Sequence, residues 1–245
     1  MEAAQTIRQA VARVTQLRHA EAAHPGLREA VRTIKALQGR RFSGTYADML
    51  SGGPYAAAAR FFLEELYSDR DFAERDAQFA RIAGAIEKFF PAQVVQTAIG
   101  LAQLHALTED LDHSMAVQWL AQDDSALPAQ RYVRAWRIVD RRDDRHAQLK
   151  DVLAMGQEMS RLTRAPGLRT MLRMMRGPAT AAGLGSLQRF LETGFDTFAA
   201  MSRGGLAPQF LRTIEQREAQ LIANLFDAPG VACETELANL LGQAP

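Results

Sequence analysis

The chain has 245 residues, of which 47% are hydrophobic and 23% are charged, and its 29 Lys and Arg against 28 Asp and Glu give a net charge of +1. This length allows one large domain or two small ones, and the balanced charge excludes a chain that is basic throughout. The single cysteine, Cys233, excludes an intramolecular disulfide and a metal site built from several cysteines.

Two kinds of segment that direct a chain to a membrane are missing from the sequence. No apolar run approaches the ~18 residues that predict a transmembrane helix. The first residues, MEAAQTIRQAVARV, lack the basic region followed by an apolar run that defines a secretory signal. We therefore expect a cytoplasmic protein with no transmembrane segment.

Apolar residues recur with the helical period along nearly the whole chain, and runs of alternating β-branched residues are missing. Breaks such as Pro25-Gly26 and Gly204-Gly205 separate the periodic stretches. The sequence predicts an all-α, multi-helical bundle of about ten helices with no sheet, folded as one domain over residues 1–245. The helices are expected near residues 3–23, 26–39, 54–67, 72–90, 92–121, 128–140, 146–163, 167–176, 184–202, 207–226 and 234–241.

Residues 53–122 are expected to form the centre of the fold, as a helical hairpin followed by a core helix. Residues 227–245 are expected to be a C-terminal tail that carries one short helix. The lone Cys233 in this tail has no histidine nearby in sequence, so it is interpreted as a packing residue rather than as a nucleophile.

The predicted hairpin carries a distinctive motif. The run Phe61-Phe62-Leu63-Glu64-Glu65-Leu66-Tyr67, followed by SDRDFAERDAQFARI, resembles an uncharacterised bacterial protein family known by its FFLEELY motif. The resemblance covers about residues 55–82, and it implies no activity, cofactor or functional residue.

The two adjacent glutamates of this motif have different environments on a helical wheel drawn at about 100° per residue. Glu64 falls on the polar face, whereas Glu65 falls between Phe61 and Phe62 on the apolar face. In the next helix, Arg75 lies in the middle of the apolar arc. Because an unpaired buried charge costs several kcal/mol, we expect Glu65 and Arg75 to pair inside the core and to fix the hairpin. A ligand-binding or metal-ligating Glu65 is the alternative.

The turn inside the hairpin has its own sequence signal. Asp71 at a predicted N-cap, with Glu74 three residues later, has the form of a capping box. We therefore expect the second helix of the hairpin to begin at about residue 72.

The predicted core helix at residues 92–121 carries four ionisable side chains on one face. His105, Glu109 and His113 are spaced i, i+4, i+8, and Asp112 lies beside them. Imidazole and carboxylate groups at this spacing can converge on a divalent metal. The run His105-x3-Glu109-x2-Asp112 is similar in spacing to the HxxxDxxH pattern of the haem-oxygenase-like di-iron oxidases, but the last histidine is replaced by Asp112.

In helical di-iron proteins, other helices supply further ligands from inside the bundle. Two inward-facing glutamates on other helices could do so here. The complete set of candidate metal ligands is Glu65, His105, Glu109, Asp112, His113 and Glu218. If they converge, iron or manganese is the expected cofactor and dioxygen chemistry is the natural use of the site.

The alternative for the same side chains is a buried hydrogen-bond network without a cofactor. His105–Glu109 and Glu109–His113 pairs would satisfy one another along the helix, and Arg75 or Arg217 could join them. Such a polar network makes a helical bundle more rigid.

A short basic stretch follows at residues 168–176. Arg169, Arg173 and Arg176 fall on one stripe of the predicted helix, opposite a side formed by Leu168, Met171, Leu172 and Met175. This amphipathic pattern is typical of a helix that packs on the core or that docks a protein or anionic partner. Nucleic-acid binding is not predicted, because that function normally requires a wider basic surface and a recognisable motif.

Two functions are consistent with these observations, and the sequence leaves open whether the protein is an enzyme. The favoured one is a non-enzymatic binding or interaction protein, in which the Glu65–Arg75 pair and the histidine network are structural. The second is a non-haem, di-iron-like metal-binding oxidase that uses the six candidate ligands.

Overall fold

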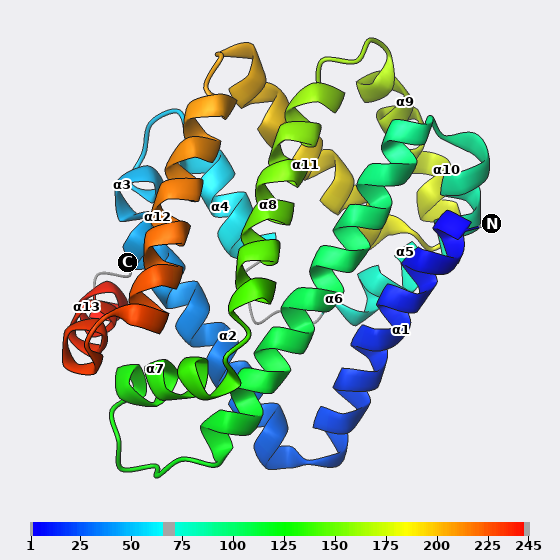
Figure 1. Cartoon of the computed structure of the whole chain (residues 1–245). Coiled ribbons are helices and arrows are strands. Elements are labelled where there is room, and N and C mark those ends of the chain that lie inside the picture. Colours follow the sequence, from blue (N-terminus) through cyan, green and yellow to red (C-terminus); the bar gives the residue numbers. More distant parts are fainter. Residues whose placement is uncertain (1, 66–71, 243–245) are drawn as a thin grey trace.

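The structure, a computed structural model, describes residues 2–65 and 72–242. These residues form helices and no strand, so the all-α prediction is confirmed (Figure 1). The helices are α1 (Glu2–Ala23), α2 (Pro25–Thr45), α3 (Ala47–Leu50), α4 (Ala56–Glu65), α5 (Ala73–Phe89), α6 (Ala92–Leu120), α7 (Pro128–Val139), α8 (Arg142–Leu162), α9 (Leu168–Met174), α10 (Arg176–Ala181), α11 (Gly185–Arg203), α12 (Ala207–Asp227) and α13 (Gly230–Gly242).

Most helices begin and end within a few residues of their predicted positions. Leu66 and Tyr67 of the FFLEELY motif, and the predicted N-cap Asp71, lie outside the described residues. The largest difference is α2, which was predicted to end at Gly39 but continues to Thr45. Its last turns are kept by packing, because Phe42 is buried and Gly44 contacts α13 so closely that a Cβ there would lie 2.0 Å from the carbonyl oxygen of Leu240.

The long helix α6 is central. It packs against α1, α2, α5, α7 and α8 (Figure 1), and its first half is apolar on nearly every side. None of the described helices is both long and apolar enough to cross a membrane.

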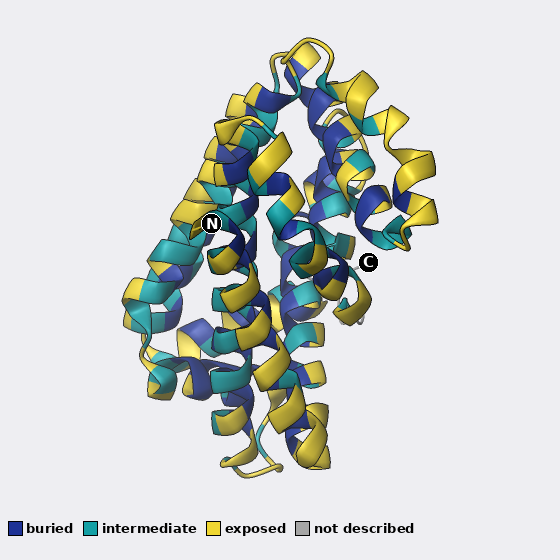
Figure 2. Ribbon diagram, turned by 90° about the vertical axis from the view of Figure 1, so that its right-hand side faces the viewer, coloured by how far each residue is buried: buried dark blue, intermediate teal, exposed yellow. Residues whose placement is uncertain are grey.

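The buried hydrophobic side chains form three clusters. Figure 2 marks the buried residues in dark blue along the ribbon. The tryptophan cluster contains Trp119 and Trp136 and is built by α2, α6, α7, α12 and α13. The phenylalanine cluster contains Phe62 and Phe198 and is built mainly by α2, α3, α4, α11 and α12. The isoleucine cluster contains Ile86 and is built by α1, α5 and α6. The candidate site lies between the last two clusters.

Most of the predicted C-terminal tail lies in α13 (Gly230–Gly242). Helix α13 packs against α2 and α7, and Cys233, Leu237 and Leu241 are buried in the tryptophan cluster. Burial raises the pKa of the Cys233 thiol above its ordinary value, so a thiolate nucleophile is disfavoured there. Its predicted packing role is consistent with this position.

Candidate functional site: a charged cavity beside an apolar cavity

Two of the predicted metal ligands on α6 contact α2. The ammonium group of Lys35 donates to both carboxylate oxygens of Glu109, at 2.7 and 2.8 Å. One turn further along, the Gln38 side-chain amide donates to Asp112 Oδ1 at 2.7 Å. Glu109 and Asp112 are both buried, so α2 supplies the polar partners that these carboxylates require.

The charges of these groups are not equally compensated. Burial raises the pKa of Asp112 to about 6, more than the attraction to Lys35 lowers it. For Lys35, burial acts to lower the pKa, but the attraction to Glu109 and Asp112 outweighs it, so the pKa is raised. The ammonium of Lys35 is therefore well compensated, whereas the ionised form of Asp112 is disfavoured.

The two histidines of α6 also contact other helices rather than each other. His105 Nε2 lies 2.9 Å from Asp76 Oδ2 on α5, and Arg18 of α1 donates to the same oxygen at 2.7 Å. These two partners lower the pKa of Asp76 although its burial acts to raise it. His113 Nδ1 lies 3.2 Å from Glu21 Oε1 on α1.

The remaining glutamate, Glu218, lies on α12 and faces α2. Arg41 Nη1 donates to Glu218 Oε1 at 2.6 Å, and the Tyr46 hydroxyl donates to the same oxygen at 2.9 Å. All three side chains are buried. This trio belongs to the interface of α2 with α12, away from the partners of His105 and His113.

The six candidate metal ligands are not brought together within the described residues. Over residues 2–65 and 72–242, no three His, Cys, Asp or Glu side chains are grouped closely enough to hold a metal ion. The physical reason is distance along α6, since His105 and His113 are separated by about 12 Å at 1.5 Å rise per residue. The facing helices meet the acidic groups with Lys, Arg and Gln instead of with further ligands.

The expected polar network exists but is built across helices. The predicted His105–Glu109 and Glu109–His113 pairs within α6 are replaced by contacts to α1, α2 and α5. Arg217, which was expected to join, instead donates to both carboxylate oxygens of Asp48 at 2.8 Å.

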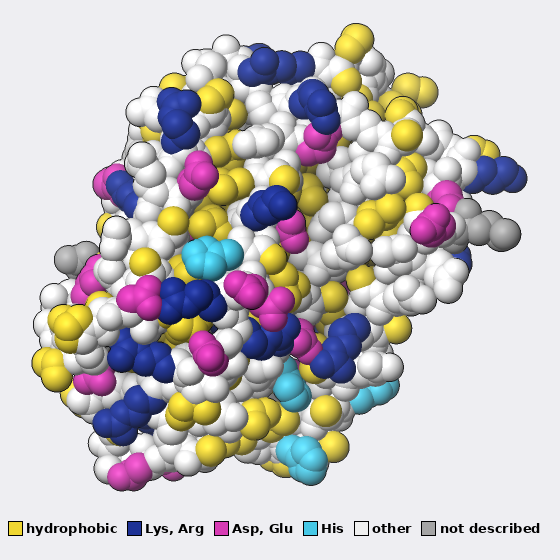
Figure 3. Space-filling view, in the orientation of Figure 1, with side chains coloured by type: hydrophobic (Ala, Val, Ile, Leu, Met, Phe, Trp, Pro, Cys, Tyr) yellow, Lys and Arg dark blue, Asp and Glu magenta, His cyan; other side chains and the backbone are white. Residues whose placement is uncertain are grey.

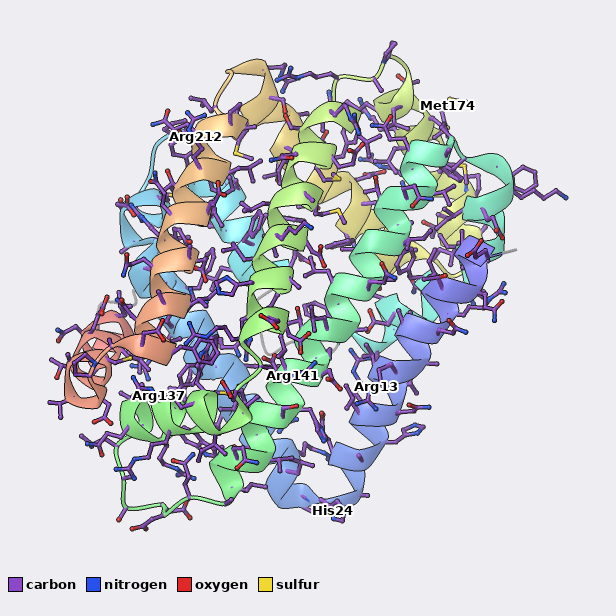
Figure 4. All side chains as sticks on the ribbon, in the orientation of Figure 1. Arg13, His24, Arg137, Arg141, Met174 and Arg212 are labelled. Atoms are coloured by element: carbon purple, nitrogen blue, oxygen red, sulfur yellow. The ribbon has the colours of Figure 1, made fainter. Side chains whose placement is uncertain are left out.

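A second polar contact lies on the outer side of α6. Arg13 of α1 and Arg141, the residue before α8, both pair with Asp110, and the two arginines are labelled in Figure 4. They lower the pKa of Asp110, although burial acts to raise it. Figure 3 shows positive and negative side chains interspersed on this face, without a large patch of one sign.

The ion pair expected between Glu65 and Arg75 is present. Arg75 Nη1 donates to Glu65 Oε2 at 3.2 Å, and 13% of the Arg75 side chain and 24% of the Glu65 side chain are exposed. The pair lies at the wall of a cavity rather than inside a closed core. The Arg75 guanidinium carbon lies 3.9 Å from the centre of the Phe72 ring and 4.4 Å from that of Phe190.

This charged cavity has a volume of about 90 Å³. It is lined by residues of α1, α2, α4, α5, α6, α8 and α11, and its polar lining comes from the α6 network and the Glu65–Arg75 pair. The acidic side chains of the lining each contact a partner described above. The cavity therefore combines mostly apolar walls with charged groups whose charges are largely matched inside the protein.

A larger apolar cavity of about 220 Å³ adjoins the charged cavity. Its walls come from α4, α5, α6, α8, α9 and α11, and among the described residues that line it only Thr97 has a polar side chain. Phe62 and Phe198 of the phenylalanine cluster form one side, and Ile86 and Ala98 of the isoleucine cluster form the other. The cavity is thus the space between two clusters that do not close against each other.

The two cavities meet at a common wall of apolar side chains. The residues that line both are Phe79, Leu101, Leu104, Val152, Leu187 and Phe190. Because Phe190 also contacts the guanidinium of Arg75, a charged group lies directly beside the apolar cavity.

Helix α9 covers the apolar cavity. Leu168, Met171 and Leu172 line the cavity, whereas Met174, labelled in Figure 4, is 72% exposed. Two arginines of the predicted docking stripe pair with α11: Arg169 Nε lies 2.9 Å from Asp196 Oδ1 and Arg176 Nε lies 2.7 Å from Glu192. These pairs reduce the charge available to an anionic partner.

A comparison with known families finds a match that covers most of the chain. Residues 16–230 match the family described as Domain of unknown function (DUF8198). The chain belongs to this family. The matched residues of DUF8198 include every residue that lines the apolar cavity. The chain matches no curated protein and no solved structure. The resemblance to the FFLEELY family and a bacterial origin stay predictions.

The apolar cavity was not predicted from the sequence. Its phenylalanines, leucines and methionines fall on the apolar faces of six helices, where each has the pattern of an ordinary core residue. Only the methionine-rich stretch before Gly177 was unusual, because methionine is common where a surface must adapt to different partners.

Proposed function

We propose that this protein binds an apolar small molecule in the cavity beneath α9, and that it acts as a binding protein rather than as an enzyme. The observation that carries the proposal is the lining of this cavity of about 220 Å³, in which the described residues contribute a single polar side chain, Thr97. An apolar cavity of roughly 150 Å³ is already sufficient to bind benzene. Together with the adjoining charged cavity, the space approaches the lower end of common ligand pockets, roughly 300 Å³.

The energetic cost of an empty cavity supports the same proposal. At about 24 cal/mol per Å³ for a closed void, an empty space of 220 Å³ that excludes water lowers the free energy of unfolding by up to about 5 kcal/mol. Native domains are stable by only about 5–15 kcal/mol in total. A ligand that fills the space recovers much of this loss as contacts and removes apolar surface from water.

The surroundings favour binding over catalysis. The ionisable side chains next to the cavity contact one another across helices, as with Lys35 and Glu109 or Arg18 and Asp76. A catalytic acid or base must instead reach a reacting atom. The adjacent charges are better suited to hold the network and to orient one end of a ligand.

Probe binding to the purified protein tests the proposal. The neutral dye N-phenyl-1-naphthylamine, which fluoresces in apolar surroundings, is titrated into the wild type and into Leu101→Trp. Leu101 lines both cavities, so the indole should occupy the space and weaken dye binding at least tenfold. Leu127→Trp is the matched control, since Leu127 is 66% exposed and lies outside both cavities.

The outcomes separate clearly. Saturable binding at about one dye per chain that is lost in Leu101→Trp and kept in Leu127→Trp supports the proposal. Absence of saturable binding to the wild type, or equal binding to both variants, contradicts it. Thermal melting of each variant is the check that it remains folded.

A further inference from the structure

We infer that the ligand is an amphiphile with a carboxylate group, and that Arg75 binds this carboxylate where the charged cavity meets the apolar one. The inference rests on the proposed function and names the ligand class for the same site. A linear saturated monocarboxylate, with its hydrocarbon chain in the apolar cavity, is the simplest molecule of this kind.

The position of Arg75 carries the first step. The side chain is 13% exposed, and the centroid distances of 3.9 and 4.4 Å place its guanidinium beside the rings of Phe72 and Phe190. Phe190 lines both cavities. The two rings therefore hold the guanidinium group of Arg75 where the charged cavity meets the apolar cavity.

The donor capacity of Arg75 carries the second step. A guanidinium has five N–H donors, and within the described residues Arg75 makes one hydrogen bond, to Glu65 at 3.2 Å. This length is at the long end of hydrogen bonds between charged groups. A ligand carboxylate can bind the remaining donors in the planar, two-point geometry that arginine favours.

The local charge balance supports an anionic rather than a cationic group. Burial lowers the pKa of Arg75, and the attraction to Asp76 and Glu65 does not restore it. Asp76 is itself shared with Arg18 and His105. Arg75 is therefore an incompletely compensated buried cation, which an additional carboxylate would stabilise.

The other carboxylates of the charged cavity do not compete for the same position. Glu109 is held by Lys35 through both oxygens. Asp112 accepts a hydrogen bond from Gln38, and the nearby charges that act on it include Lys35 and Arg145. A ligand carboxylate at Arg75 would therefore meet Glu109 and Asp112 with partners of their own on α2.

Isothermal titration calorimetry with three ligands of equal chain length tests the inference on the full chain. Decanoate, 1-decanol and decylamine differ only in the group at the polar end. We expect decanoate to bind at least tenfold more tightly than decanol, and decylamine to bind least tightly. Arg75→Met should reduce the affinity for decanoate to that for decanol and leave the affinity for decanol within twofold.

Two further variants serve as controls for the charge and for the shape of the Arg75 side chain. Arg32→Met removes the same charge from an exposed position on α2 and should leave all three affinities unchanged. Arg75→Lys keeps the charge but loses the planar fork, so decanoate should bind severalfold more weakly than to the wild type. If Arg75→Met does not fold, the ligand series on the wild type and Arg75→Lys still decides the question.

The possible negative results distinguish the proposed function from the assignment of the carboxylate and of Arg75. If none of the three ligands binds and the neutral dye does not bind either, the proposed function is wrong. If decanol binds as tightly as decanoate, or if decylamine binds best, the cavity remains a binding site and the carboxylate assignment is overturned. Equal decanoate binding by the wild type and Arg75→Met overturns the role of Arg75.

Discussion

Arg41 of α2 and Glu218 of α12 form an ion pair at 2.6 Å although they are 177 positions apart in the chain. Only 8% and 12% of their side chains are exposed, and Tyr46 contributes its hydroxyl to the same carboxylate oxygen. The pair joins the N-terminal half of the bundle to its C-terminal half.

Removing one member of this pair should be strongly destabilising. Arg41→Met leaves the Glu218 carboxylate buried without its cationic partner, and we expect the free energy of unfolding to fall by about 3–5 kcal/mol. Urea denaturation followed by circular dichroism measures the change. The control is Arg169→Met, because the Arg169–Asp196 pair is about half exposed on both sides and should contribute at most about 1 kcal/mol. Equal losses in the two variants would show that the buried pair has no special role.

Asp112 should make stability depend on pH. Its pKa of about 6 in the folded state lies above its ordinary value, so the folded state binds the proton more tightly than the unfolded state does. The associated stabilisation is present at low pH and is lost as the pH rises through 6. At pH 8 the ionised carboxylate therefore lowers the free energy of unfolding by about 3 kcal/mol relative to the protonated form.

Asp112→Asn should remove this dependence. Compared with the wild type at the same pH, the variant should gain about 2 kcal/mol more in free energy of unfolding at pH 8 than at pH 4.5. The amide oxygen can still accept the hydrogen bond from Gln38. Asp151→Asn, at an exposed position on α8, should change stability by less than about 0.5 kcal/mol at both values. A gain from Asp112→Asn that is equal at both pH values would contradict the assignment.

Gly44 should be intolerant of any side chain. A Cβ there would lie 2.0 Å from the Leu240 carbonyl oxygen and 2.8 Å from its carbon, so Gly44→Ala must separate α2 from α13. We expect a loss of about 1–3 kcal/mol in the free energy of unfolding. Gly177→Ala is the comparison, because a Cβ at Gly177 meets no atom within 4 Å. If both variants melt at the wild-type temperature, the close contact between α2 and α13 does not exist in solution.

The fold was predictable from the sequence to the extent that it is local. Helical periodicity and breaks such as Pro25-Gly26 and Gly204-Gly205 located most of the helices. The Glu65–Arg75 contact could also be predicted from the sequence, since the two residues lie on consecutive helices and both fall on apolar faces. The structural role assigned to that pair stays a prediction.

The partners of the α6 side chains could not be predicted in the same way. Glu109, Asp112 and His113 were expected on one face of α6, but their partners Lys35, Gln38 and Glu21 come from α2 and α1. Which helices face α6 depends on packing across the whole bundle. The spacing of ligands on one helix therefore indicated a metal site, whereas the neighbouring helices supply a cation and an amide to the carboxylates of α6 and carboxylates to its histidines.

The apolar cavity could not be predicted from the sequence, for a related reason. A void is a property of how side chains from six helices meet, and no local pattern distinguishes a lining phenylalanine such as Phe61 from a packed one such as Phe42. The length of α2 was missed similarly, because the contact of Gly44 with α13 lies outside any local window.

The central claim is that the apolar cavity binds a ligand, and methionine methyl NMR tests it most directly. Met155, Met159 and Met171 line the cavity, whereas Met49 and Met115 are buried in the phenylalanine and tryptophan clusters. With ¹³C-methyl-labelled methionine, titration with decanol should shift the resonances of the three lining methionines in a saturable manner and leave those of Met49 and Met115 in place. Unchanged resonances of Met155, Met159 and Met171 at saturating decanol would contradict the claim.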